Sequence, residues 1–411
     1  MRSGRPRLAF VSPVFLFPND AGGKIRSTNI LRGMKGGAFE IVLLSPATSA
    51  QAAQWQQQLV GVCDEFVPWQ PAAQRPRWMR AAHLLGGLPV NVAADRTASG
   101  LAAVQQLVGR DDIDLVVFDF VHAAVLRPRL MRQRGVCFTH NVEAEIFSRH
   151  ASQAQGAFKR WMWASQHRKM QHFEGHALRR FQRVIAVSER DAKAFKDHYG
   201  VVKAEAIPTG VDLDFFAWQA PPQPGPAQPP RVVFTGSMDW DANIDGVRYF
   251  LAQVWPQVLA AQPDARFVVV GRNPPPALLA AGRASRHVEF TGFVDDVRPY
   301  AHAAQAFVIP LLVGGGTRIK AFEAMAMGCP VVSTTVGMEG LDAEPGTHFL
   351  RHDDPASMAA AIAQLLADAP LRLQLSQQAR ALVETRFGHR EVARVFEDIC
   401  RRALHDAAPL P

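Results

Sequence analysis

The sequence predicts an α/β protein with two doubly wound, Rossmann-like domains that face each other across a cleft. Short apolar runs alternate with longer helical patterns twice along the chain, and a proline-rich stretch separates the two series. The length agrees, because 411 residues suit two domains of about 100–200 residues each.

The first half contains six runs of strand length that are apolar on both faces, as is typical of buried parallel strands. These runs are Leu8–Val11, Ile41–Leu44, Leu115–Phe118, Val136–Thr139, Val184–Val187 and Ala206–Pro208. Helical patterns lie between them, which indicates repeated βα units in a first domain over residues 1–217.

Residues 218–230 include six prolines and predict a linker, because such a stretch cannot build a core. The pattern restarts in a second domain over residues 231–385. Its expected strands are Val232–Thr235, Phe267–Val270, Val288–Phe290, Ala306–Pro310, Pro330–Ser333 and His348–Leu350. The helical pattern from Leu371 to Leu404 predicts a C-terminal helix over residues 386–411 that can cross back to the first domain. Ligands bind beyond the carboxyl ends of the strands in such sheets, so both sets of loops should face one cleft.

The composition favours an anionic partner. The net charge is +8, which suits nucleic acid, a phosphorylated small molecule or an acidic membrane surface. No aromatic and basic strand motif or zinc module supports nucleic acid, so we expect no nucleic-acid partner. The four cysteines lack ligand-like spacing, and neither a signal peptide nor an apolar run of about 18 residues is found, so we expect a cytoplasmic protein.

A glycine-rich turn follows the expected strand that ends at Pro310. Gly314, Gly315 and Gly316 allow close approach of a ligand, and Thr317 can cap the next helix, whose N-terminus suits a phosphate. Arg318 and Lys320 add charge for a diphosphate, and Glu323 can accept hydrogen bonds from vicinal hydroxyls of a ribose. The structural alternative is a flexible turn with solvated charges.

The stretch Lys320–Ser333 resembles the donor-site signature of family 4 retaining glycosyltransferases of the GT-B fold. Gly337 and Glu339-Gly340 continue the pattern. Further similar stretches are Phe234–Trp240, Val270-Gly271, Phe290–Asp296 and Ile207–Asp212. The resemblance covers essentially the whole chain.

The resemblance implies a retaining hexosyltransferase. Its donor would be a nucleotide sugar and its acceptor lipid-linked or a saccharide, in cell-surface polysaccharide synthesis, as in a bacterial subgroup linked to exopolysaccharide and exosortase-associated transfer. The donor-binding residues it implies are Gly22, Gly23, Gly236, Gly271, Arg272, Phe293, Val294, Gly314, Gly315, Gly316, Thr317 and Glu323. The catalytic residues expected are His140, Arg318 and Lys320.

Two motifs of the first half follow expected strands. Gly22 and Gly23 precede an expected helix and suit an approaching phosphate or sugar, or else they only relieve strain in a turn. His140 follows the strand ending at Thr139, so it should point into the cleft and donate a hydrogen bond near the reacting carbon. A structural histidine that caps the next helix is the alternative.

The sequence departs from the family in two places. Gly315 stands where many members carry the first of two glutamates, and Ser237–Asn243 stands where many carry Arg and Lys. The first departure leaves sugar identity open and motivates an alternative function, a catalytically inactive partner protein that binds a sugar nucleotide. A nucleotide-sugar 2-epimerase of the same fold is another alternative. No metal-binding DxD motif stands out, so we expect no cofactor and a metal-independent site.

A basic and aromatic stretch, Phe158–Lys169, predicts a helix that can lie on an anionic membrane. The alternative is a solvated helix with a core stripe. The first interpretation adds peripheral association with the inner face of the cell membrane to the expected cytoplasmic location.

Overall fold

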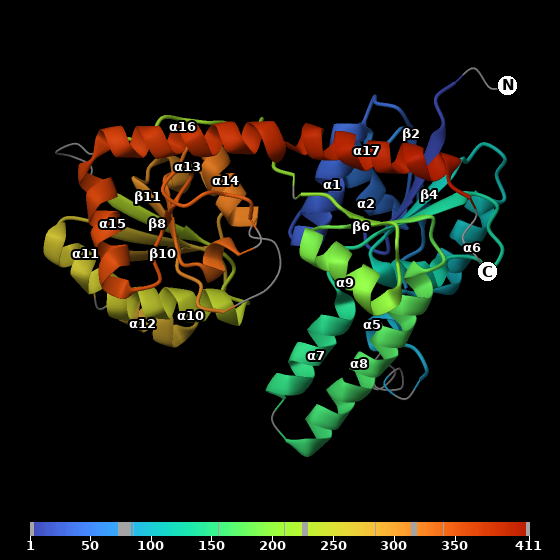
Figure 1. The fold of residues 1–411 in the computed structure, drawn as a ribbon, viewed down its shortest axis with the longest axis horizontal. Coiled ribbons are helices and arrows are strands. Elements are labelled where there is room, and N and C mark those ends of the chain that lie inside the picture. The colour runs from blue at the N-terminus through green and yellow to red at the C-terminus, as the bar shows by residue number, and fades with distance from the viewer. Residues whose placement is uncertain are drawn as a thin grey trace. The chain divides into compact units, whose positions relative to one another are not determined.

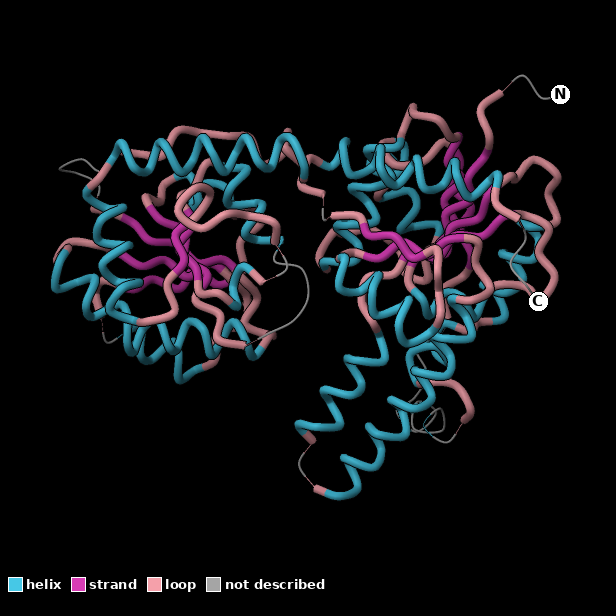
Figure 2. The backbone as a smooth tube through the Cα atoms, in the orientation of Figure 1, coloured by secondary structure: helices cyan, strands magenta, loops and turns pink. Residues whose placement is uncertain are grey.

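The computed structural model describes residues 4–72, 84, 86–154, 156–208, 210–223, 229–283, 285–313, 319–339 and 341–407 (Figures 1 and 2). The chain divides into two compact units, Met1–Gly210 together with His389–Pro411, and Val211–Gly388. Each unit is a parallel sheet with helices on both faces, as Figure 2 shows in magenta and cyan.

The sheet of the first unit has seven strands in the order β3-β2-β1-β4-β5-β6-β7. The strands are β1 (Arg7–Val11), β2 (Glu40–Pro46), β3 (Glu65–Trp69), β4 (Leu115–Asp119), β5 (Arg134–Phe138), β6 (Arg183–Ala186) and β7 (Ala204–Ala206). Leu8 of β1 pairs with Ile41 on one side and with Leu115 on the other. All six expected strands are present within a few residues, whereas β3 was not predicted, because only part of it is buried and it contains Pro68.

The helices of the first unit cover both faces of this sheet. They are α1 (Gly22–Met34), α2 (Ser49–Gln54), α3 (Gln56–Val60), α5 (Val90–Asp95), α6 (Ala98–Val108), η1 (Val121–Leu126), α7 (Glu143–Gln153), α8 (Ala157–Leu178), α9 (Glu189–Tyr199) and α17 (His389–His405). Alternate strand residues point to opposite faces. Phe10 therefore packs beneath α1 and α17, while Val11 packs on the side of α6 and α9.

The sheet of the second unit has six strands in the order β10-β9-β8-β11-β12-β13. They are β8 (Arg231–Thr235), β9 (Arg266–Val270), β10 (Val288–Gly292), β11 (Ala306–Ile309), β12 (Val331–Ser333) and β13 (Leu350–Arg351). Its helices are α10 (Asp241–Tyr249), η2 (Phe250–Val254), α11 (Trp255–Ala261), α12 (Pro276–Arg283), α13 (Arg298–His302), α14 (Ile319–Met327), η3 (Val336–Met338), α15 (Pro355–Ala367) and α16 (Ala369–Arg386). All six predicted strands of this half are present.

The boundaries between the units differ from those expected from the sequence. The second unit begins at Val211, where its backbone N–H donates to Phe387 O at 2.8 Å, and not at residue 231. The proline-rich stretch belongs to this unit, because Trp218 Nε1 donates to Ser376 Oγ at 2.9 Å and Pro222 O accepts from Gln305 Nε2 at 3.4 Å. The helical pattern from Leu371 to Leu404 is two helices, α16 in the second unit and α17, which lies within the predicted range 386–411 and belongs to the first unit.

Two further features concern the helices and the cysteines. None of the described helices is long and apolar enough to cross a membrane. All four cysteines are buried and free.

Candidate functional site

Both sheets place polar side chains at the point where their strand order reverses. If each unit's strands are numbered along the chain, its first six strands lie in the order 3-2-1-4-5-6, so the reversal falls between β1 and β4 and between β8 and β11. Loops at the carboxyl ends of those strands form the ligand crevice of doubly wound sheets. The site residues are therefore described for each unit separately.

Asp119 is the centre of a buried polar network at the reversal of the first sheet. It is the last residue of β4 and is fully buried. Its carboxylate accepts hydrogen bonds from Ser12 at 3.0 Å, from Ser27 at 2.9 Å and from His140 Nε2 at 2.7 Å. These three donors come from the end of β1, from α1 and from the end of β5, so the carboxylate joins three elements.

His140 lies at the predicted strand end, but its ring is buried. Nδ1 is 3.2 Å from an Arg26 guanidinium nitrogen, which can only donate, so the contacts fit a neutral ring whose Nε2–H donates to Asp119. Burial lowers the pKa of His140, although Asp119 opposes the shift, and the neutral form is therefore favoured. Phe120 stacks on the ring at a centroid distance of 3.9 Å. His140 therefore lies among protein groups, which agrees with the structural alternative, and its predicted contact with the donor stays a prediction.

Arg26 was not singled out from the sequence, although it brings a cation to this network. Its side chain is buried on α1, and burial lowers its pKa to about 10, so the guanidinium stays charged at neutral pH. The arrangement therefore holds one positive charge beside a neutral imidazole, at the edge of the sheet where ligands bind.

Gly22 and Gly23 are the first residues of α1. A Cβ at Gly23 would lie 2.5 Å from Phe120 Cζ and 3.7 Å from His140 Nδ1. The absence of a side chain at Gly23 thus lets α1 begin directly against the aromatic cover of His140. This supports the structural alternative for Gly23 and also ties the turn to the polar network.

Lys320 lies across the end of β8, at the reversal of the second sheet. It comes from the first turn of α14, and its Nζ donates to Asn243 Oδ1 at 2.9 Å and lies 4.4 Å from the centroid of the Phe234 ring. A Cβ at Gly236 would come within 2.8 Å of this nitrogen. Lys320 therefore reaches this strand end only because residue 236 has no side chain.

Gly271 allows a second close contact, between the loops that follow β8 and β9. A Cβ there would lie 1.9 Å from the carbonyl oxygen of Gly236. The loops after β8 and β9 are joined by hydrogen bonds from Gly236 N to Val270 O at 2.9 Å and from Met238 N to Arg272 O at 3.0 Å. Both predicted glycines thus allow the backbone to pack on itself at this edge.

Glu323 follows Lys320 by three residues, which places both side chains on one face of α14. Its side chain is half-buried, and it accepts no hydrogen bond from any residue within the described ranges. Burial raises the pKa of this carboxyl group to about 7, against the opposing charge of Lys320. A carboxyl group held in this way is available as an acceptor for a ligand.

The other predicted donor residues of the second unit lie at the same edge. Arg272 forms an ion pair with Asp239 at 2.8 Å. Phe293 follows β10 and is 71% exposed, whereas Val294 packs partly against the core. Gly314, Gly315, Gly316, Thr317 and Arg318 lie outside the described residues, so their roles stay predictions.

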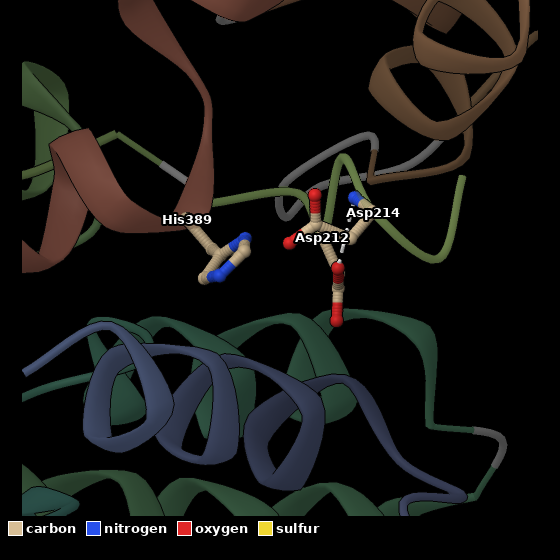
Figure 3. A group of neighbouring side chains, drawn as sticks. All are labelled: Asp212, Asp214 and His389. Carbon is tan, nitrogen blue, oxygen red and sulfur yellow. Dashed lines mark hydrogen bonds between the residues drawn. The ribbon is translucent and has the colours of Figure 1, made fainter. Parts of the chain in front are cut away.

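The structure gives neither unit a metal site of its own among the residues that it describes. Three possible ligands, Asp212, Asp214 and His389, are drawn in Figure 3, but the aspartates belong to the second unit and the histidine to the first. Asp212 Oδ1 accepts from the backbone N–H of Asp214 at 3.2 Å and of Phe215 at 3.0 Å. This pattern gives Asp212 a local role in the turn that opens the second unit.

Family models match both halves of the chain. The model "Glycosyltransferase Family 4" matches residues 27–215, and "Glycosyl transferases group 1" matches residues 229–368. The chain belongs to the family 4 glycosyltransferases. Both matches include the edges of the sheets described above, with His140 in the first and Lys320 and Glu323 in the second.

The curated relatives of this glycosyltransferase include mannosyltransferases. "Phosphatidyl-myo-inositol mannosyltransferase" of Mycobacterium tuberculosis is 33% identical over 185 residues, 44% of this chain and 48% of the relative. A "GDP-mannose-dependent monoacylated alpha-(1-6)-phosphatidylinositol monomannoside mannosyltransferase" of Corynebacterium glutamicum is 28% identical over 48% of this chain and 56% of the relative. The chain thus spans about half the length of the curated relatives it matches.

Solved structures share the GT-B fold of this glycosyltransferase. Sucrose-phosphate synthase from Thermosynechococcus elongatus superposes with a TM-score of 0.68 at 17% identity, over 98% of this chain and all of that one. Anabaena HepE in complex with UDP gives 0.66 at 14% identity, over 96% of this chain and all of that one. TarM superposes with a TM-score of 0.68 at 11% identity, over 96% of this chain and 98% of the TarM chain. Together with the two parallel sheets, these likenesses establish the fold.

Sequence reasoning missed four residues of the network in the first unit, Asp119, Ser12, Ser27 and Arg26. A signal was present for Asp119, because an acidic residue directly after the apolar run Leu115–Phe118 marks a carboxyl strand end. Ser27 and Arg26 lie inside a helix, where nothing local distinguishes them from other polar positions.

Proposed function

We propose that this glycosyltransferase moves a sugar from a nucleoside diphosphate donor to an acceptor hydroxyl with retention. The observation that carries the proposal is the pairing of Lys320 with Glu323 on one turn of α14, at the reversal of the second sheet. A fixed cation suits a phosphate, and a carboxyl group without a described partner suits two vicinal ribose hydroxyls. Phe293 offers exposed apolar surface for the base.

In the reaction, the bond between C1 of the sugar and the diphosphate oxygen breaks, and the electron pair stays on the phosphate. The acceptor oxygen then bonds to C1 and releases its proton. Lys320, together with Arg318, would stabilise the charge that grows on the leaving phosphate. We propose that no metal ion takes part, because these cations supply the charge that Mg²⁺ provides elsewhere.

His140 takes a revised role in this proposal. Both ring nitrogens contact protein groups, Arg26 and Asp119, so the histidine acts as a positioning residue for the Arg26 cation. Gly22 and Gly23 then set the position of α1, which carries Arg26.

The activities of the curated relatives support a proposed biological setting. They act on phosphatidylinositol lipids, one of them with GDP-mannose. We propose a hexosyl donor, and an acceptor that is lipid-linked or a saccharide at the inner face of an anionic membrane, in the synthesis of a cell-surface polysaccharide. The basic composition suits both an anionic donor and such a surface.

The test measures the release of nucleoside diphosphate from a panel of UDP-, GDP- and ADP-sugars, with and without a membrane extract as acceptor source. We expect release with one donor that depends on the extract, and at least about a 100-fold loss in Glu323→Ala, since two charge-assisted hydrogen bonds are removed. Glu289→Ala, at an exposed position on β10 of the same unit, is the matched control and should keep full activity.

Two outcomes would reject the proposal. Tight binding of a donor with no release of nucleoside diphosphate under any acceptor condition would make the protein an inactive sugar-nucleotide binder. An epimerised sugar nucleotide formed from the donor alone would make it an epimerase. The anomeric configuration of the product, measured by NMR, decides retention.

A further inference from the structure

A helical hairpin, α7 and α8, projects from the first unit (Figure 1). Its base is fixed to the body by Glu174 of α8. The Glu174 carboxylate accepts the backbone N–H of Glu143 at 2.9 Å and of Ala144 at 3.3 Å, and also the Tyr199 hydroxyl at 2.8 Å. These bonds cap the start of α7 and hold the hairpin to the unit.

The distal end of the hairpin exposes two large apolar rings. Every residue from Gly156 to Trp161 is exposed. Phe158 is 73% and Trp161 59% exposed, and their ring centroids lie 6.2 Å apart. The first turns of α8 thus present a continuous aromatic surface, which is costly in water unless a partner covers it.

The same hairpin carries positive charge without acidic residues. Residues 146–173 contain no Asp or Glu. The basic residues of this stretch are Arg149, Lys159, Arg160, Arg168 and Lys169. Lys159 and Arg160 stand between the two exposed rings in the sequence, in the same first turns of α8, and neither forms an ion pair with any residue that the structure describes. Within the hairpin, cations and aromatic rings therefore occupy one exposed tip.

We infer that this tip, residues 156–161, inserts into the surface of an anionic lipid bilayer. Aromatic rings prefer the level of the lipid headgroups, and neighbouring cations are attracted to anionic lipids. A nucleic acid would satisfy Lys159 and Arg160 but would not bury both exposed rings in an apolar medium. No described helix can span the membrane, so the contact would be peripheral. The inference does not depend on the sugar-transfer reaction.

The first experiment is flotation of the full chain with two kinds of vesicle. One kind is phosphatidylcholine alone, and the other contains about 30% phosphatidylglycerol, which makes its surface strongly anionic. We expect binding to the anionic vesicles only. Arg160→Glu/Trp161→Ser should lower the partition coefficient at least about 25-fold, because one lost cation accounts for about fivefold and the new acid repels by a similar factor.

The chain offers a matched control in the same unit. Arg129 and Leu130 are also an adjacent cation and apolar residue, with Leu130 92% exposed, but they lie outside the hairpin. Arg129→Glu/Leu130→Ser makes the same changes in charge and apolar surface, and it should bind vesicles as the wild type does. Thermal unfolding of both double variants checks that each is folded.

Insertion is measured separately by quenching of tryptophan fluorescence with brominated lipids. Quenching should occur in the wild type and fall markedly in Trp161→Phe, which keeps an aromatic ring at that position. The inference is overturned if the tip variant binds as tightly as the control, or if Trp161→Phe leaves the quenching unchanged. Tip-dependent binding to heparin or DNA without such quenching would also overturn it, because the tip would then be a site for a polyanion.

Discussion

Replacing Glu323 with glutamine should stabilise the protein without ligand while weakening donor binding. The pKa of this carboxyl is raised by burial from 4.5 to about 7. Between these values the native protein holds a proton that the unfolded chain has released, so the free energy of unfolding falls as the pH rises through this window. Above pH 7 the native protein carries the full cost of a buried charge, which glutamine does not have.

The size of the effect follows from the same shift. A change from 4.5 to about 7, at about 1.4 kcal/mol per unit, corresponds to at most about 3.5 kcal/mol. Because the side chain keeps some contact with solvent, screening reduces the expected gain to about 1–2 kcal/mol at pH 8. Near pH 4.5 the wild type and Glu323→Gln should be about equally stable.

Urea unfolding at pH 5, 6, 7 and 8 measures this difference, and isothermal titration with the active donor measures binding. Glu289→Gln, which removes an exposed carboxyl of the same unit, should follow the wild type at each pH. If Glu323→Gln is less stable than the wild type at pH 8, the carboxylate has a stabilising partner and the reasoning fails. Unchanged donor affinity would remove Glu323 from the site.

Three further variants test the two sheet edges. Gly271→Ala places a Cβ 1.9 Å from the Gly236 oxygen, so its backbone must move and the free energy of unfolding should fall by about 1–3 kcal/mol, measured by urea unfolding. Asp119→Asn leaves too few acceptor atoms for the three hydrogen-bond donors, so kcat should fall about 10–100-fold while the affinity for the sugar donor stays unchanged. An equal loss in kcat and in affinity would instead make the network part of the binding site. Lys320→Met should weaken donor binding about 10–100-fold and reduce the dependence of the affinity on salt concentration, both measured by titration calorimetry. An unaltered salt dependence would contradict a contact between Lys320 and a phosphate.

The functional sites could be predicted in part. The motif that begins at Lys320 located the carboxyl edge of the second sheet, because strand-to-helix turns are encoded by consecutive residues. The sequence placed His140 at a strand end but did not indicate its two partners, because Arg26 and Asp119 are 114 and 21 positions away in sequence. No local pattern reports such partners.

The sequence by itself determined the α/β class and the two series of strands. These properties depend on short-range order, since a strand buried on both faces must be apolar at every position. β3 was not predicted from the sequence because it is only partly buried. The boundary between the two units was also not predicted correctly. The proline-rich stretch packs on the second unit through contacts of Trp218 and Pro222 with residues far along the chain.

Only the tertiary structure decided which side chains meet. Asp119 joins the ends of β1 and β5 to α1, and Lys320 reaches β8 over a strand end that lacks a side chain at Gly236. Local propensity fixes each element, but the order of the strands fixes which carboxyl ends become neighbours. The physical reason is that parallel strands adjacent in a sheet are separated in sequence by whole helices, so their contacts arise only when the sheet has formed.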